Sequence, residues 1–176
     1  MTRARFALFA TILLFAGGCD HATKQIARDA LGGAPVISLA ADTVRFQLTE
    51  NRGGFLSLGA SLPAGLRHIF FLGIAPLALL AVAIPVLRAR SPSFWPTFAL
   101  ALVAGGGLAN WVERLVNDGA VTDFVSLGVG SLRTGIFNLA DVFVMAGVAI
   151  LLLTGFGESS AEPRSEAAAP DGGTPA

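Results

Sequence analysis

The sequence is poor in charge and in thiols. Only 14% of its 176 residues are Asp, Glu, Lys or Arg, and Cys19 is its single cysteine. One cysteine cannot form an internal disulfide, and the two histidines, His21 and His68, lie far apart in the sequence, so we expect no zinc site. Twelve basic residues balance twelve acidic ones, which leaves no electrostatic basis for binding nucleic acid.

Hydrophobic residues, by contrast, make up 53% of the chain, which is typical of a protein that crosses a membrane several times. A helix needs about 20 mostly apolar residues to cross the hydrocarbon core. Four segments approach that length: Phe6 to about Cys19, extendable towards Arg28; Ile69 to Leu87; Phe94 to about Trp111; and Phe137 to Phe156. Pro76 and Pro85 must kink the second of these helices or leave carbonyls for other donors to satisfy. The fold class predicted is an all-α membrane protein with four transmembrane helices.

Basic residues in the short loops predict the orientation of these helices, because such loops favour the cytoplasm. Arg3 and Arg5 precede the first span, and Arg88 and Arg90 lie between the second and the third. Both loops are therefore expected to be cytoplasmic, as are both termini.

This topology divides the chain into a membrane domain of residues 1–157 and a short tail. Residues 29–68 and 112–136 are then outside the cell membrane. The tail, residues 158–176, is rich in Ala, Pro, Gly, Ser and Glu, so it is predicted to be disordered in the cytoplasm.

The first outer segment contains a short strand pattern. Apolar and polar residues alternate over residues 44–49, and Gly53 and Gly54 then mark a turn. Phe55, Leu56 and Leu58 add apolar side chains that could lie on the bilayer surface. A period of two is the signature of a half-buried strand. We therefore predict a small extracytoplasmic β element above the helix ends.

Polar side chains gather at the outer ends of the predicted spans. They are Asp20, Lys24, Asn51, Arg52, Asn110, Glu113, Arg114, Asp123, Asn138 and Asp141. Each one alone can be interpreted as a solvated span end. As a group they indicate a function, because charged residues at membrane depth are energetically expensive.

Asp123 and Asp141 are the pair with the clearest chemistry. Asp141 lies about one turn inside the last span among apolar neighbours, and Asp123 joins it if the segment around residues 121–124 folds back onto the bundle. Two adjacent carboxyl groups share one proton, because both cannot ionise side by side. Such a pair can take a proton from water and polarise a peptide carbonyl.

Other chemistries are less well supported. Neither histidine falls in the polar layer and no GxSxG motif occurs, which disfavours a serine hydrolase. The glycines at 105–107 lie inside a span, where they favour close helix packing rather than phosphate binding.

Five motifs follow one another in a characteristic order: DHATK at 20–24, NRGGF at 51–55, GGGLANWVER at 105–114, VTDF at 121–124 and FNLAD at 137–141. Over about residues 5–157 the chain resembles lipoprotein signal peptidase, or signal peptidase II. The resemblance implies an aspartic endopeptidase of the cell inner membrane, without metal or other cofactor. It would cleave prolipoproteins just before a diacylglyceryl-modified cysteine, at the extracytoplasmic face, among membrane lipids and as a monomer.

The resemblance also implies residue roles. Asp123 and Asp141 match the catalytic pair. Side chains that bind substrate or support the pair are matched by Asn51, Gly53, Asn110, Arg114, Asn138, Asp20, Lys24 and Glu113. Two positions depart from the family pattern: Glu113 stands where the family usually has Asp, and Phe55 comes one residue early, so that Leu56 takes the aromatic position.

Other interpretations remain open from the sequence. One is a non-catalytic membrane carrier, and another is a family-derived protein that binds prolipoproteins without cutting them. A third is a lipoprotein anchored at Cys19. Ala16 occupies the place where a lipobox has Leu, Val or Ile, which favours a retained first helix.

Overall fold

The computed structural model describes residues 3–88 and 94–158. Its long helices are α1 (Arg3–Leu31), α3 (Ala75–Arg88), α4 (Phe94–Val116) and α5 (Leu139–Glu158). A short helix α2 (Ala64–His68) and a π-helical segment η2 (Ile69–Ile74) precede α3, and a 3-10 turn η1 (Phe55–Ser57) precedes them. The predicted tail from residue 159 on, and Arg90 in the second loop, lie outside the described residues.

Helix α4 is the centre of the bundle, and its glycines make this possible. A Cβ on Gly105 would lie 2.8 Å from the Cβ of Ala16 in α1, and one on Gly106 would lie 2.4 Å from the carbonyl oxygen of Ala140 in α5. A Cβ on Gly107 would lie 3.2 Å from Leu79 in α3. The three glycines thus face three different helices, which confirms that they serve packing.

The predicted consequence of Pro76 is also seen. Proline has no N–H, so the carbonyl of Leu72, four residues earlier, loses its usual helical partner. Trp111 of α4 donates its indole N–H to this carbonyl oxygen at 3.1 Å. The π-helical segment η2 lies immediately before this proline, and α3 is fastened to α4 at the same point.

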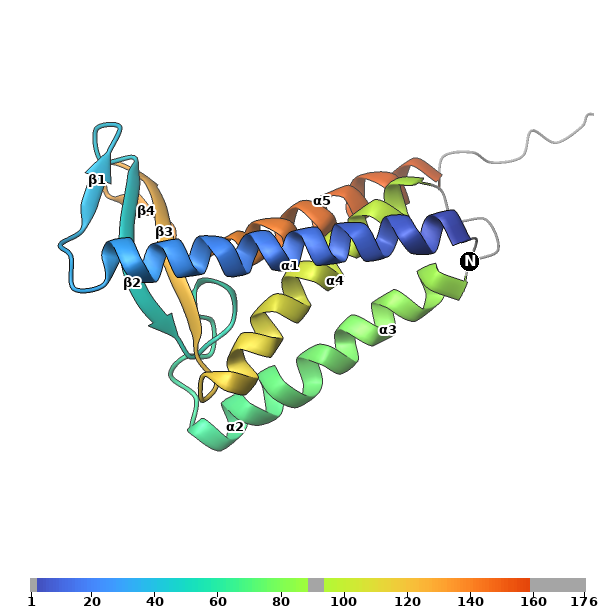
Figure 1. Ribbon diagram of the computed structural model, residues 1–176, viewed down its shortest axis with the longest axis horizontal. Coiled ribbons are helices and arrows are strands. Elements are labelled where there is room, and N and C mark those ends of the chain that lie inside the picture. The colour runs from blue at the N-terminus through green and yellow to red at the C-terminus, as the bar shows by residue number, and fades with distance from the viewer. Residues whose placement is uncertain (1–2, 89–93, 159–176) are drawn as a thin grey trace, which may run out of the picture.

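A four-stranded antiparallel sheet lies across one end of the helices (Figure 1). Its strands are β1 (Ile37–Leu39), β2 (Val44–Asn51), β3 (Val121–Val129) and β4 (Leu132–Arg133), in that order. The predicted strand over residues 44–49 is therefore correct and is part of the longer β2. In the pairing of β2 with β3, Asn51 lies opposite Val121 and Thr49 opposite Asp123. This pairing folds the segment of Asp123 back onto the bundle.

The architecture is mostly helical with a small sheet, in agreement with the coarse prediction. Two helical stretches, Arg3–Leu31 and Ala64–Ala81, are long and apolar enough to cross a membrane, and Leu139–Thr154 is a shorter apolar helix. Helix α4 extends five residues beyond the predicted Trp111, and α1 three beyond Arg28. Figure 1 shows the N-terminus and the far end of α5 together, at the end of the bundle opposite the sheet.

Candidate active site

The first turn of α5 holds Asp141 in a reciprocal cap. Asn138 precedes the helix, and its Oδ1 accepts the backbone N–H of Asp141 at 3.0 Å. Asp141 Oδ2 in turn accepts the backbone N–H of Asn138 at 3.3 Å. This is the geometry of a capping box, in which the N-cap and N3 residues satisfy each other's amides. The sequence N-L-A-D therefore starts the helix and fixes one carboxylate at the same time.

Asp123 lies near the start of β3 and is 1% exposed. Its Oδ2 accepts the side-chain amide of Asn51 at 2.8 Å, and its Oδ1 accepts that of Asn138 at 2.7 Å. Burial raises the pKa of Asp123 to about 6, although the Asn51 hydrogen bond opposes this; the nearby charge of Asp141 raises it further. The protonated form of this carboxyl group is therefore favoured over that of a solvated aspartate.

The two carboxylates meet at Asn138. Its side-chain amide binds Asp123, and its backbone amide binds Asp141. Asp141 receives a further hydrogen bond, from Asn110 Nδ2 to its Oδ1 at 2.9 Å. Each carboxyl group thus has a donor on both of its oxygens, in a layer where Asn138 is only 1% exposed.

The orientation of each asparagine amide is dictated by a partner that can only donate. Asn110 Oδ1 accepts Lys24 Nζ at 2.7 Å, so its NH₂ group must face Asp141. Asn138 Oδ1 accepts a backbone N–H, so its NH₂ group faces Asp123. Asn51 Oδ1 likewise accepts the backbone N–H of Gly53 at 2.8 Å. Because lysine ammonium and backbone N–H groups have no acceptor atom, the three amides cannot be reversed without losing these bonds.

Lys24 is buried, and acceptors surround its ammonium group. These are Asp20 Oδ2 at 2.7 Å, Glu113 Oε2 at 2.8 Å and Asn110 Oδ1. Two ion pairs and one hydrogen bond thus hold the ammonium group, and such pairing is the condition under which a buried charge is tolerated. Asp20 Oδ1 also accepts the backbone N–H of Ala140 at 2.9 Å. Helix α1 is thereby bound to the start of α5.

Gly53 and Arg114 form one boundary of the site. A Cβ on Gly53 would lie 2.6 Å from the carbonyl oxygen of Leu58, so only glycine fits this turn. Arg114 donates to the carbonyl oxygens of Gly53 at 2.5 Å and of Asn110 at 3.3 Å. Its guanidinium carbon lies 5.2 Å from the ring centre of Phe71, a cation–π arrangement.

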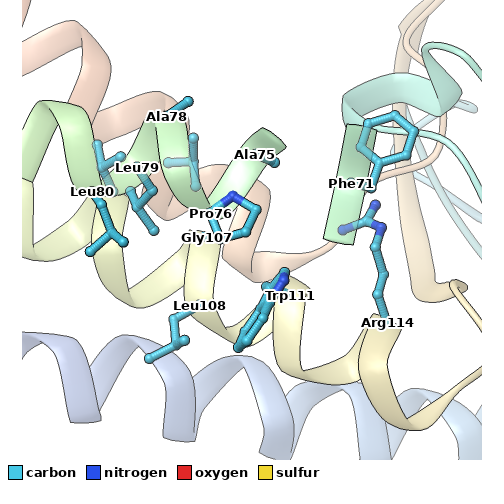
Figure 2. Close-up of a pocket in the computed structure, with 12 residues that line it drawn as sticks. Phe71, Ala75, Pro76, Ala78, Leu79, Leu80, Gly107, Leu108, Trp111 and Arg114 are labelled. Carbon is cyan, nitrogen blue, oxygen red and sulfur yellow. The ribbon is translucent and has the colours of Figure 1, made fainter. Parts of the chain in front are cut away.

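An apolar pocket of about 510 Å³ opens between α3 and α4, beside the polar layer (Figure 2). Leu79, Leu108 and Trp111 line it, and Arg114 lies at its outer end. Val144, one turn after Asp141 on α5, also contributes to its wall. The Nε atom of Arg114 is buried and has no hydrogen-bond partner among the described residues.

Arg52, which the sequence also placed with the polar residues at the span ends, is exposed and pairs with Asp118. The ten site residues that the family resemblance implies lie in this one layer. They are Asp20, Lys24, Asn51, Gly53, Asn110, Glu113, Arg114, Asp123, Asn138 and Asp141. Two further polar side chains in it, Arg28 and Thr122, were not selected. The signal for Arg28 was its spacing, because Asp20, Lys24 and Arg28 follow each other at four-residue intervals along one face of a helix. Thr122 lies within the VTDF motif, but it is uncharged, and the selection favoured charged residues.

Ser126 and the possible metal ligands were also considered within the part of the chain that the structure describes. Ser126 is buried, and its hydroxyl donates to the carbonyl oxygen of Thr134 at 3.1 Å. Within residues 3–88 and 94–158, no group of three His, Cys, Asp or Glu side chains is placed to hold a metal ion.

Comparisons with known proteins bear on the family and on the fold of the chain. The family model described as signal peptidase (SPase) II matches residues 11–156. The chain is 33% identical to a lipoprotein signal peptidase of Bifidobacterium adolescentis, over 89% of this chain and 80% of that protein. It is 35% identical to one of Escherichia coli, over 68% and 72% of the two chains. A bacterial membrane enzyme, solved by the in meso method at 2.3 Å resolution, shares the fold with a TM-score of 0.75 and 21% identity, over 90% of this chain and 93% of that one.

Proposed function

The chain belongs to the signal peptidase II family, and on that basis we propose that it removes signal peptides from prolipoproteins, with Asp123 and Asp141 as the catalytic pair. The observation that supports this most directly is the convergence of both carboxylates on Asn138. Cleavage falls just before the diacylglyceryl-modified cysteine of the substrate.

The reaction follows from two carboxyl groups that share one proton. The ionised group takes a proton from a water molecule as the water oxygen attacks the scissile carbonyl carbon. The protonated group donates its proton to the carbonyl oxygen, which gives a gem-diol intermediate. Collapse of this intermediate breaks the C–N bond: the carboxyl group that is now protonated gives its proton to the leaving nitrogen, and the ionised one takes a proton from a gem-diol hydroxyl. No covalent acyl-enzyme forms.

The supporting residues hold the two carboxyl groups in fixed positions relative to each other. Asn51, Asn110 and Asn138 present N–H groups to the carboxylates, and Lys24, with Asp20 and Glu113, fixes the direction of Asn110. Preorganised donors of this kind do not need to reorient during the reaction.

The apolar pocket beside the dyad is the proposed place for the apolar part of the substrate. Its walls are side chains of α3 and α4, which suits acyl chains or a signal helix that arrives from the bilayer. Arg114 at its outer end has an N–H free of partners among the described residues. We assign this N–H to a carbonyl oxygen of the substrate.

In the membrane, α1, the α2–α3 segment, α4 and α5 are proposed to be the four spans. The sheet and the dyad then lie at the extracytoplasmic face. Arg3, Arg5 and Arg88 lie in segments at the opposite end of the bundle (Figure 1), where the cytoplasm of an inner-membrane protein would be. We propose a monomer as the functional unit.

Cleavage of a lipidated prolipoprotein by the purified full chain tests this function. Asp123→Asn and Asp141→Asn are each expected to abolish cleavage while the protein remains inserted and folded. Asp118→Asn is the matched control, because Asp118 is an exposed residue that pairs with Arg52, and it should cleave normally. If the parent protein binds the precursor but leaves it intact, the chain is a non-catalytic binder; normal cleavage by either dyad variant contradicts the assignment.

A further inference from the structure

One carboxylate oxygen, of Glu113, binds the start of strand β3 to the helices. Glu113 Oε1 accepts the hydroxyl of Thr122 at 2.7 Å and the backbone N–H of Thr122 at 3.1 Å. Glu113 lies on α4 and Thr122 on β3. The residue directly before Asp123 is therefore held by both its main chain and its side chain.

Arg28 of α1 completes this contact. One of its guanidinium nitrogens donates to Thr122 Oγ1 at 2.6 Å and to Glu113 Oε1. The hydroxyl of Thr122 thus accepts a hydrogen bond from Arg28 and donates one to Glu113, so that it acts as both acceptor and donor. Three elements, α1, α4 and β3, meet at this triangle of side chains.

The two oxygens of Glu113 have separate tasks. Oε1 binds Thr122 and Arg28, whereas Oε2 lies 2.8 Å from Lys24 Nζ. Lys24 in turn binds Asn110, the donor to Asp141. One glutamate side chain therefore connects the supports of both catalytic carboxylates.

We propose that Arg28 and Thr122 are positioning residues for Asp123 and act through Glu113. This inference rests on the proposed function of the dyad. A movement of residue 122 passes to residue 123 through a single peptide unit, which is planar and stiff. Asp123 must stay within hydrogen-bond distance of both Asn51 and Asn138 to face Asp141.

Kinetics of prolipoprotein cleavage by the full chain test this. Thr122→Val keeps the shape and the backbone N–H but removes the hydroxyl, and we expect kcat to fall about tenfold with KM unchanged, as for loss of a hydrogen bond to a charged acceptor. Thr122→Ser restores the hydroxyl and should restore kcat. Arg28→Met should lower kcat similarly, with partial rescue in Arg28→Lys.

Controls make the same changes at the other end of the sheet. Thr43→Val lies in the turn before β2, and Arg45→Met removes an ion pair with Asp42. Both should keep the parental kcat.

A combined Thr122→Val and Arg28→Met variant should lose less than the product of the single losses, because both residues act on one oxygen. Parental kcat in Thr122→Val, or a loss that Thr122→Ser does not repair, would overturn the inference. If Thr122→Val does not fold, the comparison of Arg28→Met with Arg28→Lys decides in the same way. Failure of the proposed function is distinct, because the parent itself would then not cleave.

Discussion

Replacement of Asn138 by serine should separate the two tasks of this residue. As N-cap, Asn138 accepts the backbone N–H of Asp141 through its oxygen. As a site residue, it donates through its nitrogen to Asp123 at 2.7 Å. Serine has an oxygen for the first task but is too short, and lacks the amide N–H, for the second. Alanine can do neither.

The expected magnitudes differ for folding and for catalysis. Serine and asparagine are about equally good N-caps, whereas alanine at this position costs about 1 kcal/mol. Loss of a hydrogen bond to a carboxylate costs about 1.5–3 kcal/mol, which corresponds to a roughly 10- to 150-fold lower rate. Asn138→Ser should therefore be about 1 kcal/mol more stable than Asn138→Ala, and it should cleave roughly 10- to 150-fold more slowly than the parent. Asn138→Ala should show a similar loss of rate and a lower stability.

Two measurements on the detergent-purified chain decide this. Thermal unfolding gives the stability of each variant, and the kcat for a lipidated prolipoprotein gives the effect on the chemical step. Full activity in Asn138→Ser would refute the assignment of the side-chain amide to the dyad. Equal stability of the serine and alanine variants would refute the capping role instead.

Three further predictions concern burial, a freed carbonyl and helix packing. Because the pKa of Asp123 is raised to about 6, this carboxyl group binds a proton more tightly in the folded protein than in the unfolded chain. The unfolding free energy should therefore increase as the pH falls from about 6 towards 4. Thermal unfolding of Asp123→Asn should lack this pH dependence. Trp111→Phe leaves the Leu72 carbonyl without its donor and should lower the unfolding free energy by about 1–3 kcal/mol in denaturant titrations. Gly106→Ala should separate α4 from α5 and abolish cleavage, whereas Gly18→Ala, which has open space around its Cβ position, should retain activity and parental melting.

The site could be predicted from the sequence because its residues are tied to helix ends. Asp20 and Lys24 lie at four-residue spacing after an apolar run, and Asn138 and Asp141 begin another. Polar residues at such places in apolar helices are few, so their shared level is visible without coordinates. The spacing also contained Arg28, but Gln25 and Asp29 beside it are polar too, so the pattern offered no reason to separate Arg28 from a solvated helix end.

The strand that carries Asp123 was not predicted as a strand. Residues 121–129 include both polar and apolar residues on each face, so no clean alternation marks them. Their β conformation comes from pairing with β2, which lies 70 or more residues earlier in the chain. Such non-local pairing is not encoded in a local pattern, and the same holds for the contact between Thr122 and Glu113.

The position of the dyad follows from the needs of the helices themselves. An α-helix leaves its first N–H groups without internal partners, and at the start of α5 these groups are satisfied by Asn138 and Asp20. In an apolar bundle these acceptors are needed at the start of the helix. At the same place, N–H donors can hold a buried carboxylate. Gly106 brings α4 so close to Ala140 that Asn110 can reach Asp141. Substitutions that disturb the cap, the glycine contact or the amide directions should therefore all converge on one functional defect, a misplaced Asp141.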